Sequence, residues 1–286
     1  MEGLQLQRIA VLGAGVMGQG IAVVFARSGY ETQVYDVFPA SLEKAEAYAK
    51  RFLMKSVERG KMSEEEREAA LGRLSFTTEL SEVQADLVIE AVPEKIALKH
   101  KVLQQVESQH SDQLIIASNT STLPITRIAA PLQRPERVVG MHFFNPAPIM
   151  KLVEVISGAA TSPDIATGIH QLAEELGKRP IHVKDEPGFV VNRVARQFYV
   201  ESLKVLEDGV ASVEGIDRLM RSSGFRMGPF ELMDLIGIDT NHSVTQSMYE
   251  AFFFDEKFRP SRIQQKKVDA GHWGRKRGKG FYLYED

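Results

Sequence analysis

The feature that most constrains the fold of this chain is a glycine-rich turn between a short apolar run and a helical pattern. The apolar run Ile9–Leu12 has the composition of a buried strand, and the helical pattern covers Met17–Ser28. Gly13 permits a tight turn, Gly15 lets a phosphate approach the backbone, and Gly18 lets the helix pack closely on the strand. Because the first N–H groups of a helix have no partners within it, this geometry suits a pyrophosphate. The expected dinucleotide contacts are those of the motif itself: Gly13, Gly15, Val16, Met17 and Gly18.

An acidic residue at the end of the next apolar run completes the dinucleotide pattern. The run Thr32–Tyr35 is followed by Asp36, which lies 18 residues beyond Gly18. A carboxylate at this position can accept hydrogen bonds from both ribose hydroxyls, and it repels a 2′-phosphate. Val37 and Phe38 follow Asp36, where an NADP enzyme would place an arginine. The sequence therefore predicts NAD as the cofactor.

Apolar runs alternate with helix-length amphipathic segments over the first two-thirds of the chain. Uninterrupted apolar strands between helices are typical of a parallel sheet that is covered on both faces. The predicted fold class is therefore α/β, with a Rossmann-type N-terminal domain. Strands are expected at Ile9–Leu12, Thr32–Tyr35, Leu87–Ala91, Leu114–Ala117, Val138–His142, Leu152–Ile156 and Ile181–Val183. Helices are expected at Met17–Ser28, Ala40–Glu58 and Ile165–Leu176, the last with Ser162 as its cap, Pro163 at its first position and Gly177 after its end.

The pattern changes to helical periodicity near Asp185–Gly188. We expect a domain boundary there, which gives an N-terminal domain of residues 1–186 and a smaller all-helical domain of residues 187–286. Helices of the second domain are expected at Phe189–Glu207, Val213–Arg221, Phe230–Ile236, Thr240–Phe253 and Ser261–Ala270, and a strand pattern returns only at Gly280–Tyr284.

The composition excludes several classes of protein. A net charge of -3 does not favour nucleic acid or an anionic membrane as a partner. The chain has no cysteine, which excludes disulfides, thiolate zinc sites and a cysteine nucleophile, and no metal site is expected. Apolar stretches such as Ile21–Ala26 fall far below the roughly 18 residues that span a bilayer. The chain start, Met1–Gln7, lacks the pattern of a targeting sequence, so a cytoplasmic protein is expected.

Polar residues follow two of the expected strands. Glu90 and Lys95 lie at or just after the end of one strand, and Ser118-Asn119-Thr120-Ser121 follows the next. Open α/β sheets bind ligands at the carboxyl ends of their strands, so these residues are candidates for the cofactor pocket. Either group could equally be a turn with capping residues.

A histidine and a glutamate lie twelve residues apart in one strand-turn-strand segment. His142 ends the run that begins at Val138, and Glu154 interrupts the apolar run Leu152–Ile156. An acid in a core-facing strand needs a partner, and a histidine is a natural one. Oxidation of an alcohol by NAD needs a base that titrates near neutrality, and a neighbouring carboxylate orients the imidazole and stabilises the imidazolium. The pair is therefore the candidate catalytic centre.

The chain resembles the 3-hydroxyacyl-CoA dehydrogenases. The resemblance rests on the glycine motif from Gly13 to Gly18 and on motifs spread over essentially the whole chain: Ser118-Asn119-Thr120-Ser121, His142-Phe143-Phe144-Asn145-Pro146, Lys151-Leu152-Val153-Glu154-Val155, Pro187-Gly188-Phe189-Val190-Val191-Asn192-Arg193, Met227-Gly228-Pro229-Phe230-Glu231-Leu232 and Gly280-Phe281-Tyr282.

The resemblance implies a role for each matching residue. His142 is expected to be the general base, and Glu154 its orienting carboxylate. The other implied active-site residues are Ser121, Asn145 and Asn192, and the implied cofactor contacts beyond the glycine motif are Asp36, Glu90, Lys95 and Asn119. Because Asn192 lies past the domain boundary, the resemblance implies a substrate cleft between the domains, and it also implies a homodimer formed through the helical domain.

The resemblance also places coenzyme A near the helix after the second strand. The candidate phosphate contacts in that region are Arg51, Lys55, Arg59 and Lys61. A charged helical run can equally be a solvated face with no ligand.

The pattern leaves the substrate open, and two other classes of protein share parts of it. The substrate could be 3-hydroxybutyryl-CoA or the dicarboxylic 3-hydroxyadipyl-CoA. A non-catalytic protein of the λ-crystallin kind, or an L-gulonate-type dehydrogenase, shares the architecture, but its segment after the histidine differs from Phe143-Phe144-Asn145-Pro146. A β-hydroxyacid dehydrogenase with a lysine proton donor is disfavoured because the segment Pro187–Arg193 contains Asn192 and no lysine.

Overall fold

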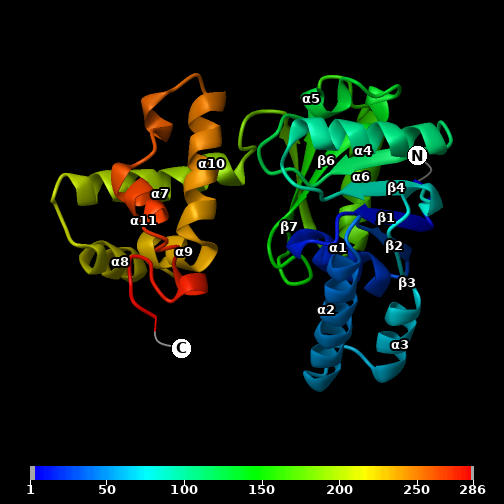
Figure 1. The fold of residues 1–286 in the computed structure, drawn as a ribbon, viewed down its shortest axis with the longest axis horizontal. Helices are drawn as coiled ribbons and strands as arrows, with labels where there is room; N and C mark the ends of the chain where they lie inside the picture. The colour runs from blue at the N-terminus through cyan, green and yellow to red at the C-terminus, as the bar shows by residue number, and fades with distance from the viewer. Residues whose placement is uncertain (1–3, 285–286) are drawn as a thin grey trace. The chain divides into compact units, whose positions relative to one another are not determined.

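The computed structural model describes residues 4–284 and divides the chain into two compact units (Figure 1). The first unit ends at Glu186 and the second begins at Pro187. Each unit has a hydrophobic core of its own.

The first unit is built on one sheet of eight strands in the order β3-β2-β1-β4-β5-β6-β7-β8. All neighbouring pairs are parallel except β6 and β7, which are antiparallel. The strands are β1 (Arg8–Leu12), β2 (Glu31–Tyr35), β3 (Leu74–Thr77), β4 (Leu87–Glu90), β5 (Ile115–Ser118), β6 (Val138–Phe143), β7 (Leu152–Ser157) and β8 (Arg179–Lys184). The order of the first six strands is that of a dinucleotide-binding sheet, and the α/β prediction is confirmed.

The handedness of the crossovers decides which face each helix covers. The connection from β1 to β2 moves toward one edge of the sheet, and the connections from β4 to β5 and from β5 to β6 move toward the other edge. Because parallel crossovers are right-handed, helix α1 lies on one face and helices α4 and α5 on the other. Strand β7 runs opposite to β6, so the same rule places α6, which connects β7 to β8, on the face of α1. Helices α1 and α6 accordingly share one hydrophobic cluster. These helices are α1 (Val16–Arg27), α4 (Ile96–Gln109), α5 (Ile125–Ala129) and α6 (Pro163–Glu175).

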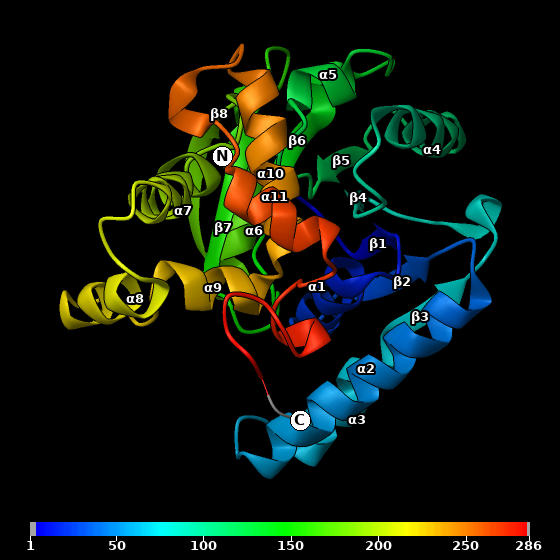
Figure 2. The ribbon, with the colours of Figure 1, turned by 60° about the vertical axis from the view of Figure 1, so that its left-hand side comes forward.

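Two helices project from the sheet side by side as a hairpin (Figure 2). They are α2 (Pro39–Glu58) and α3 (Glu64–Gly72), and α3 begins with a reciprocal capping box between Ser63 and Glu66. A small apolar cluster that includes Val23 of α1 and Leu53 of α2 holds the base of the hairpin. The sequence analysis predicted α2 but missed α3 and the edge strand β3, whose four residues contain no continuous apolar run.

The antiparallel strand β7 corrects the expectation of a purely parallel sheet. Its sequence is as apolar as that of its neighbours, and this made it look parallel. Only the eight residues 144–151 connect β6 to β7, and a parallel crossover needs a dozen or more. The chain therefore has to turn back, and β7 pairs with β6 in reverse.

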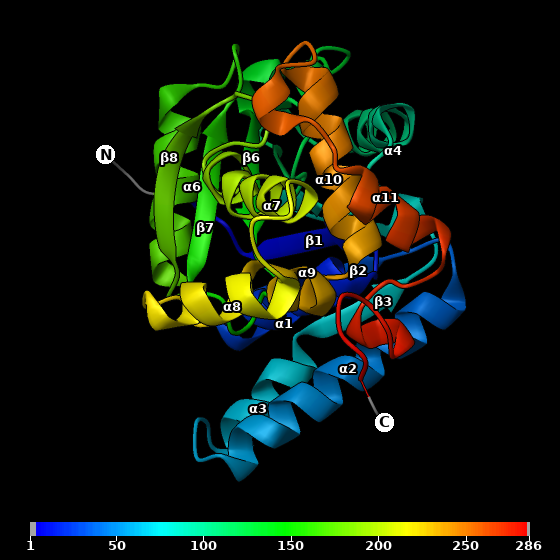
Figure 3. The same ribbon diagram turned by 90° about the vertical axis from the view of Figure 1, so that its left-hand side faces the viewer.

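The second unit is helical, as predicted. Its helices are α7 (Val191–Glu207), α8 (Val213–Ser222), α9 (Pro229–Ile236), α10 (Ile238–Ala251) and α11 (Arg262–Asp269), and Figure 3 shows α8 beside α9 and α10 beside α11. Helix α7 starts two residues later than expected, because Gly188 and Phe189 have φ angles of 72° and 51°. The strand expected at Gly280–Tyr284 is reduced to an isolated bridge at Leu283. No helix among residues 4–284 is long and apolar enough to cross a membrane.

Candidate active site

The glycine turn brings three segments of backbone into contact. Gly13 has a φ of 101°, and its N–H donates to the carbonyl of Tyr35 at 2.7 Å. A Cβ on Gly13 would lie 2.6 Å from the carbonyl oxygen of Ala91, and one on Gly18 would lie 1.7 Å from the carbonyl oxygen of Gly13. Both positions therefore exclude every side chain. A Cβ on Gly15 would meet nothing within 4 Å, so the space above Gly15 is open for a ligand.

The start of α1 is suited to an anion. Gly15 is the N-cap residue, it supplies no side-chain hydrogen bond, and the first turn contains no acidic residue. Val16 and Met17 follow as the first helical residues, with Val16 exposed. The N–H groups of this turn and the positive end of the helix dipole favour a phosphate.

Asp36 fixes the glycine turn from the end of β2. Its carboxylate accepts hydrogen bonds from the N–H of Ala14 at 2.8 Å and from the N–H of Phe38 at 3.0 Å. Asp36 is half-buried, while Val37 and Phe38 beside it are exposed. The side chain therefore lies where the sequence analysis expected it, at the carboxyl edge of the sheet beside the glycine turn.

His142 and Glu154 are directly opposite each other on β6 and β7. The imidazole Nδ1 lies 2.7 Å from Glu154 Oε2, the glutamate is fully buried and the histidine is 6% exposed. The twelve-residue spacing thus gives a cross-strand pair, at the same carboxyl edge as the glycine turn. A hydrogen bond from Nδ1 to the carboxylate makes Nε2 the nitrogen that can accept a proton.

Comparison with known proteins assigns both units to one family. Residues 8–186 match the family described as 3-hydroxyacyl-CoA dehydrogenase, NAD binding domain, and residues 188–284 match its C-terminal domain. The chain belongs to the 3-hydroxyacyl-CoA dehydrogenase family. The resemblance found in the sequence is therefore confirmed, as is NAD as the cofactor.

Relatives of known name cover nearly the whole chain. A probable 3-hydroxybutyryl-CoA dehydrogenase of Bacillus subtilis is 42% identical over 285 residues, which span 99% of each chain. A 3-hydroxyadipyl-CoA dehydrogenase of Escherichia coli is 43% identical over 98% of this chain, which spans only 59% of that protein. The crystal structure of an (S)-3-hydroxybutyryl-CoA dehydrogenase from Ralstonia eutropha superposes with a TM-score of 0.94 at 39% identity, and it covers 99% of this chain and 100% of that one.

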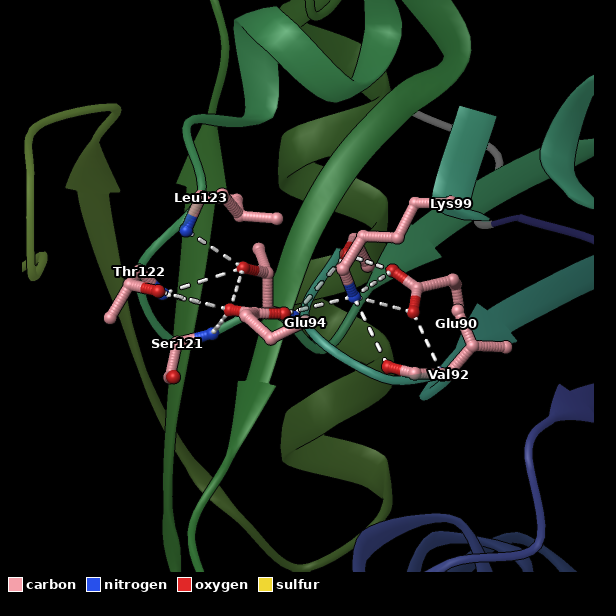
Figure 4. Close-up of polar contacts among 9 residues, drawn as sticks. Glu90, Val92, Glu94, Lys99, Ser121, Thr122 and Leu123 are labelled. Atoms are coloured by element: carbon pink, nitrogen blue, oxygen red, sulfur yellow. Dashed lines mark hydrogen bonds and ion pairs between the residues drawn. The ribbon is translucent and has the colours of Figure 1, made fainter. Parts of the chain in front are cut away.

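In this dehydrogenase, a buried lysine joins two acidic residues at the end of β4 (Figure 4). Lys99, on α4, is 1% exposed, and its Nζ lies 2.6 Å and 2.8 Å from the two carboxylate oxygens of Glu90. The same Nζ lies 3.0 Å from Glu94 Oε2. Ser118 Oγ and the N–H of Val92 also donate to Glu90, so its fully buried carboxylate is surrounded by donors.

Glu94 in turn holds the loop that carries Ser121. One of its oxygens, Oε1, accepts from Thr120 Oγ1 at 2.5 Å, from the N–H of Ser121 at 3.0 Å and from the N–H of Thr122 at 3.2 Å. Burial on its own raises the pKa of Glu94, but the charge of Lys99 and the hydrogen bond from Thr120 outweigh it, and the pKa is lowered. The loop is therefore anchored on a carboxylate that stays ionised, and Figure 4 shows both ends of this network.

Lys99 and Glu94 were missed by the sequence analysis, which expected Glu90 and Lys95 in this region. Glu90 is enclosed by protein donors, and Lys95 is exposed at the N-cap of α4. The signal for Lys99 is its helical position: it lies three, four and seven residues before the buried Val102, Leu103 and Val106 and shares their face.

The two asparagines of the first unit differ in their surroundings. Asn119 Oδ1 accepts from the N–H of Phe143 at 2.8 Å, so Asn119 links the end of β5 to the end of β6. Asn145 lies exposed two residues beyond the end of β6, three residues after His142.

The other expected residues lie on helix α7, and on helix α2 or just after it. Asn192 lies in the first turn of α7 in the second unit, where the buried guanidinium of Arg196 lies 3.5 Å from its Oδ1. Arg51, Lys55 and Arg59 are exposed at intervals of four residues along α2 and its C-cap, and Lys61 is exposed just after it. None of these four cations takes part in an ion pair within residues 4–284.

Replacement of Lys99 by methionine is expected to destabilise the first unit strongly. The change leaves Glu90 and Glu94 without their shared cation, and loss of one partner from a buried ionic cluster costs about 3–5 kcal/mol. The free energy of unfolding, measured in urea, should fall by that amount, whereas the exposed neighbour Lys101→Met should change it by less than about 0.5 kcal/mol. Equal stability of the two variants would show that Lys99 is dispensable.

Proposed function

We propose that this protein oxidises the 3-hydroxyl group of a short-chain (S)-3-hydroxyacyl-CoA to the 3-oxo group, reversibly and with NAD as the hydride acceptor. The observation that carries the proposal is the buried His142–Glu154 pair at the sheet edge that also carries the glycine turn. The names of the B. subtilis and R. eutropha relatives support 3-hydroxybutyryl-CoA as the substrate. The E. coli relative supports 3-hydroxyadipyl-CoA as the alternative.

The reaction transfers a hydride to the cofactor and a proton to the histidine. NAD, when bound at the glycine turn, supplies the acceptor for the hydride that leaves C3. His142 takes the proton of the 3-hydroxyl on Nε2, and the two electrons of the O–H bond form the carbonyl π bond as the hydride departs. Glu154 holds Nδ1–H and stabilises the imidazolium that results. In the reverse direction His142 returns this proton to the carbonyl oxygen.

The remaining residues are proposed to bind and orient the reactants. Ser121 and Asn192 hydrogen-bond the reacting oxygens of the acyl group, and Asn145 supports the same site. Asp36 holds the adenosine ribose, with Asn119, Lys95 and the Glu90 cluster shaping the rest of the cofactor pocket. Arg51, Lys55 and Arg59, exposed and without ion-pair partners in the described residues, are available to the phosphates of coenzyme A.

The direct test is NADH formation with a series of (S)-3-hydroxyacyl-CoA substrates. The series should contain 3-hydroxybutyryl-CoA, longer linear chains and 3-hydroxyadipyl-CoA. The proposal requires turnover of the four-carbon substrate, and a marked preference for the dicarboxylic one would select the alternative. Failure to form NADH from any of them would refute the function.

We also propose that the protein acts as a cytoplasmic homodimer in fatty acid metabolism, as part of β-oxidation. Its reactants, acyl-CoA and NAD, are intracellular, and the helical unit exposes large apolar side chains of the kind that dimers cover. These side chains are Val194, Val210, Leu219, Leu235 and Phe253.

Substitution of His142 by glutamine should abolish turnover while NAD still binds. Removal of a general base costs about 10²–10⁴ in rate, and the glycine turn and Asp36 lie on other strands. The rate should be measured by NADH formation and NAD binding by calorimetry. His182→Gln, which changes an exposed histidine on β8, is the control and should keep full activity. Near wild-type turnover of His142→Gln would contradict the mechanism.

Glu154→Gln should lower kcat greatly. Glutamine removes the negative charge that stabilises the imidazolium formed when His142 takes the proton of the 3-hydroxyl group. Glutamine keeps the shape and one acceptor, so the melting temperature should change little. NADH formation measures kcat, and a thermal melt measures the stability. The exposed Glu174→Gln is the control, and full activity of Glu154→Gln would show that the pair is incidental.

The double substitution Asp36→Ser with Val37→Arg should shift selectivity toward NADP. Serine removes the charge that repels a 2′-phosphate but keeps an acceptor for the N–H of Ala14, and the arginine can pair with the phosphate. The ratio of kcat/KM for NADP to that for NAD should rise by at least about tenfold, as one charge-assisted hydrogen bond allows. Val37→Arg alone separates the two effects. Preference of the wild-type protein for NADP would overturn the assigned role of Asp36.

Light scattering should give a particle of twice the 31.9 kDa chain mass at micromolar concentration. Leu219→Glu places a charge in one of the exposed apolar positions of the helical unit and should weaken association. Glu214→Gln, at an exposed polar position of the same helix, is the control. A particle of one chain mass for the wild-type protein would rule out the dimer.

A further inference from the structure

One buried cation of the first unit has no acidic partner among the described residues. Lys178 is 8% exposed, lies in the turn between α6 and β8, and takes part in no ion pair within residues 4–284. Its Nζ donates to the carbonyl oxygen of Ala147 at 2.6 Å and to that of Met150 at 3.0 Å. The positive charge is therefore directed at two peptide carbonyls of one loop.

That loop joins the two strands of the catalytic pair. It covers residues 144–151, between the end of β6, which carries His142, and the start of β7, which carries Glu154. The N–H of Arg179, the residue after Lys178, donates to the carbonyl of Lys151 at 2.7 Å. Two consecutive residues at the start of β8 thus hold three carbonyls of the loop.

The loop also touches the helix of the dinucleotide turn. A Cβ on Gly20 of α1 would lie 3.2 Å from Pro148 Cδ and 3.3 Å from the Cβ of Ala147. Ala147 and Pro148 are themselves buried, although Asn145 and Ile149 on either side of them are exposed. The loop therefore packs against α1 in its middle and joins the two strands of the catalytic pair at its ends.

The charge of Lys178 is retained at a free-energy cost. Burial, together with the nearby charge of Arg27, lowers the pKa of Lys178 to about 8. A buried ammonium without a carboxylate is unfavourable unless its hydrogen bonds require it. Hydrogen bonds from a charged donor are about twice as strong as those from a neutral one, so the ammonium fixes the loop more firmly than a neutral side chain could.

We propose that Lys178 is a positioning residue that fixes the loop 144–151 and thereby sets the separation of His142 and Asn145 from the bound substrate. The proposal rests on the function proposed above and adds a residue that touches neither reactant. A displacement of about 1 Å in a catalytic group can lower the rate by 10²-fold, so loss of the anchor should act on kcat. NAD affinity should be little affected, because the glycine turn and Asp36 are held by other contacts.

The experiment compares Lys178→Met, Lys178→Gln and Lys178→Arg with the control Lys184→Met, an exposed lysine at the end of β8. Amide hydrogen exchange reports the loop directly, because the N–H groups of Ile149 and Met150 donate to the carbonyl of Pro146. Steady-state kinetics with 3-hydroxybutyryl-CoA give kcat and KM separately, and calorimetry gives the affinity for NAD.

In Lys178→Met, exchange at Ile149 and Met150 should quicken about tenfold and kcat should fall about 10- to 100-fold, with NAD affinity unchanged. Lys178→Arg, which keeps the charge, should recover part of kcat, and Lys184→Met should match the wild type. If the methionine variant does not fold, the same measurements on the glutamine variant, which keeps a neutral N–H donor, test the proposal.

Unchanged exchange and kcat in the folded variants would overturn the proposal, as would an increase in exchange spread evenly over the whole first unit. Failure of the wild-type protein to oxidise any 3-hydroxyacyl-CoA would overturn the function instead. The exchange measurement would still report whether Lys178 anchors the loop.

Discussion

The antiparallel pairing of β6 with β7 is the constraint on which the site depends. The six strands before β7 could belong to any dinucleotide-binding sheet, but only this reversal places Glu154 directly opposite His142. Side chains that face each other across an antiparallel pair lie about 4.5–5.5 Å apart at Cβ, close enough for an imidazole to meet a carboxylate. A slip by one residue would turn Glu154 to the other face and leave a charge in the apolar core. The fold and the chemistry thus require the same register.

Much of this arrangement could be read from the sequence, because it follows from local patterns. The glycine turn, Asp36 and the apolar strands are signalled by residue type and spacing, and the motifs around His142 and Glu154 identify the family. The direction of β7 was not signalled by its composition and follows instead from the length of the loop before it. The edge strand β3 and the short helix α5 lack strong periodicity, and neither was predicted.

The buried lysines were harder to foresee, because their role depends on partners distant in the sequence. Lys99 meets Glu90 and Glu94 only once α4 has packed against the sheet, and Lys178 meets the loop 144–151 only because β8 pairs with β7. A lysine in a sequence is normally read as exposed. Its position on the apolar face of a helix, as for Lys99, is the one local sign that it is not.

Both units hold charged side chains with backbone groups, and this determines how rigid the site can be. Lys178 donates to carbonyls, Glu94 accepts from the N–H groups of Ser121 and Thr122, and in the helical unit Asp234 accepts from the N–H groups of Phe281 and Tyr282. A surface ion pair is screened by salt and holds two flexible side chains loosely. A buried charge bound to peptide groups is screened little and fixes the chain itself. Charged side chains therefore hold the loops that carry Ser121 and Asn145 through the backbone groups of those loops.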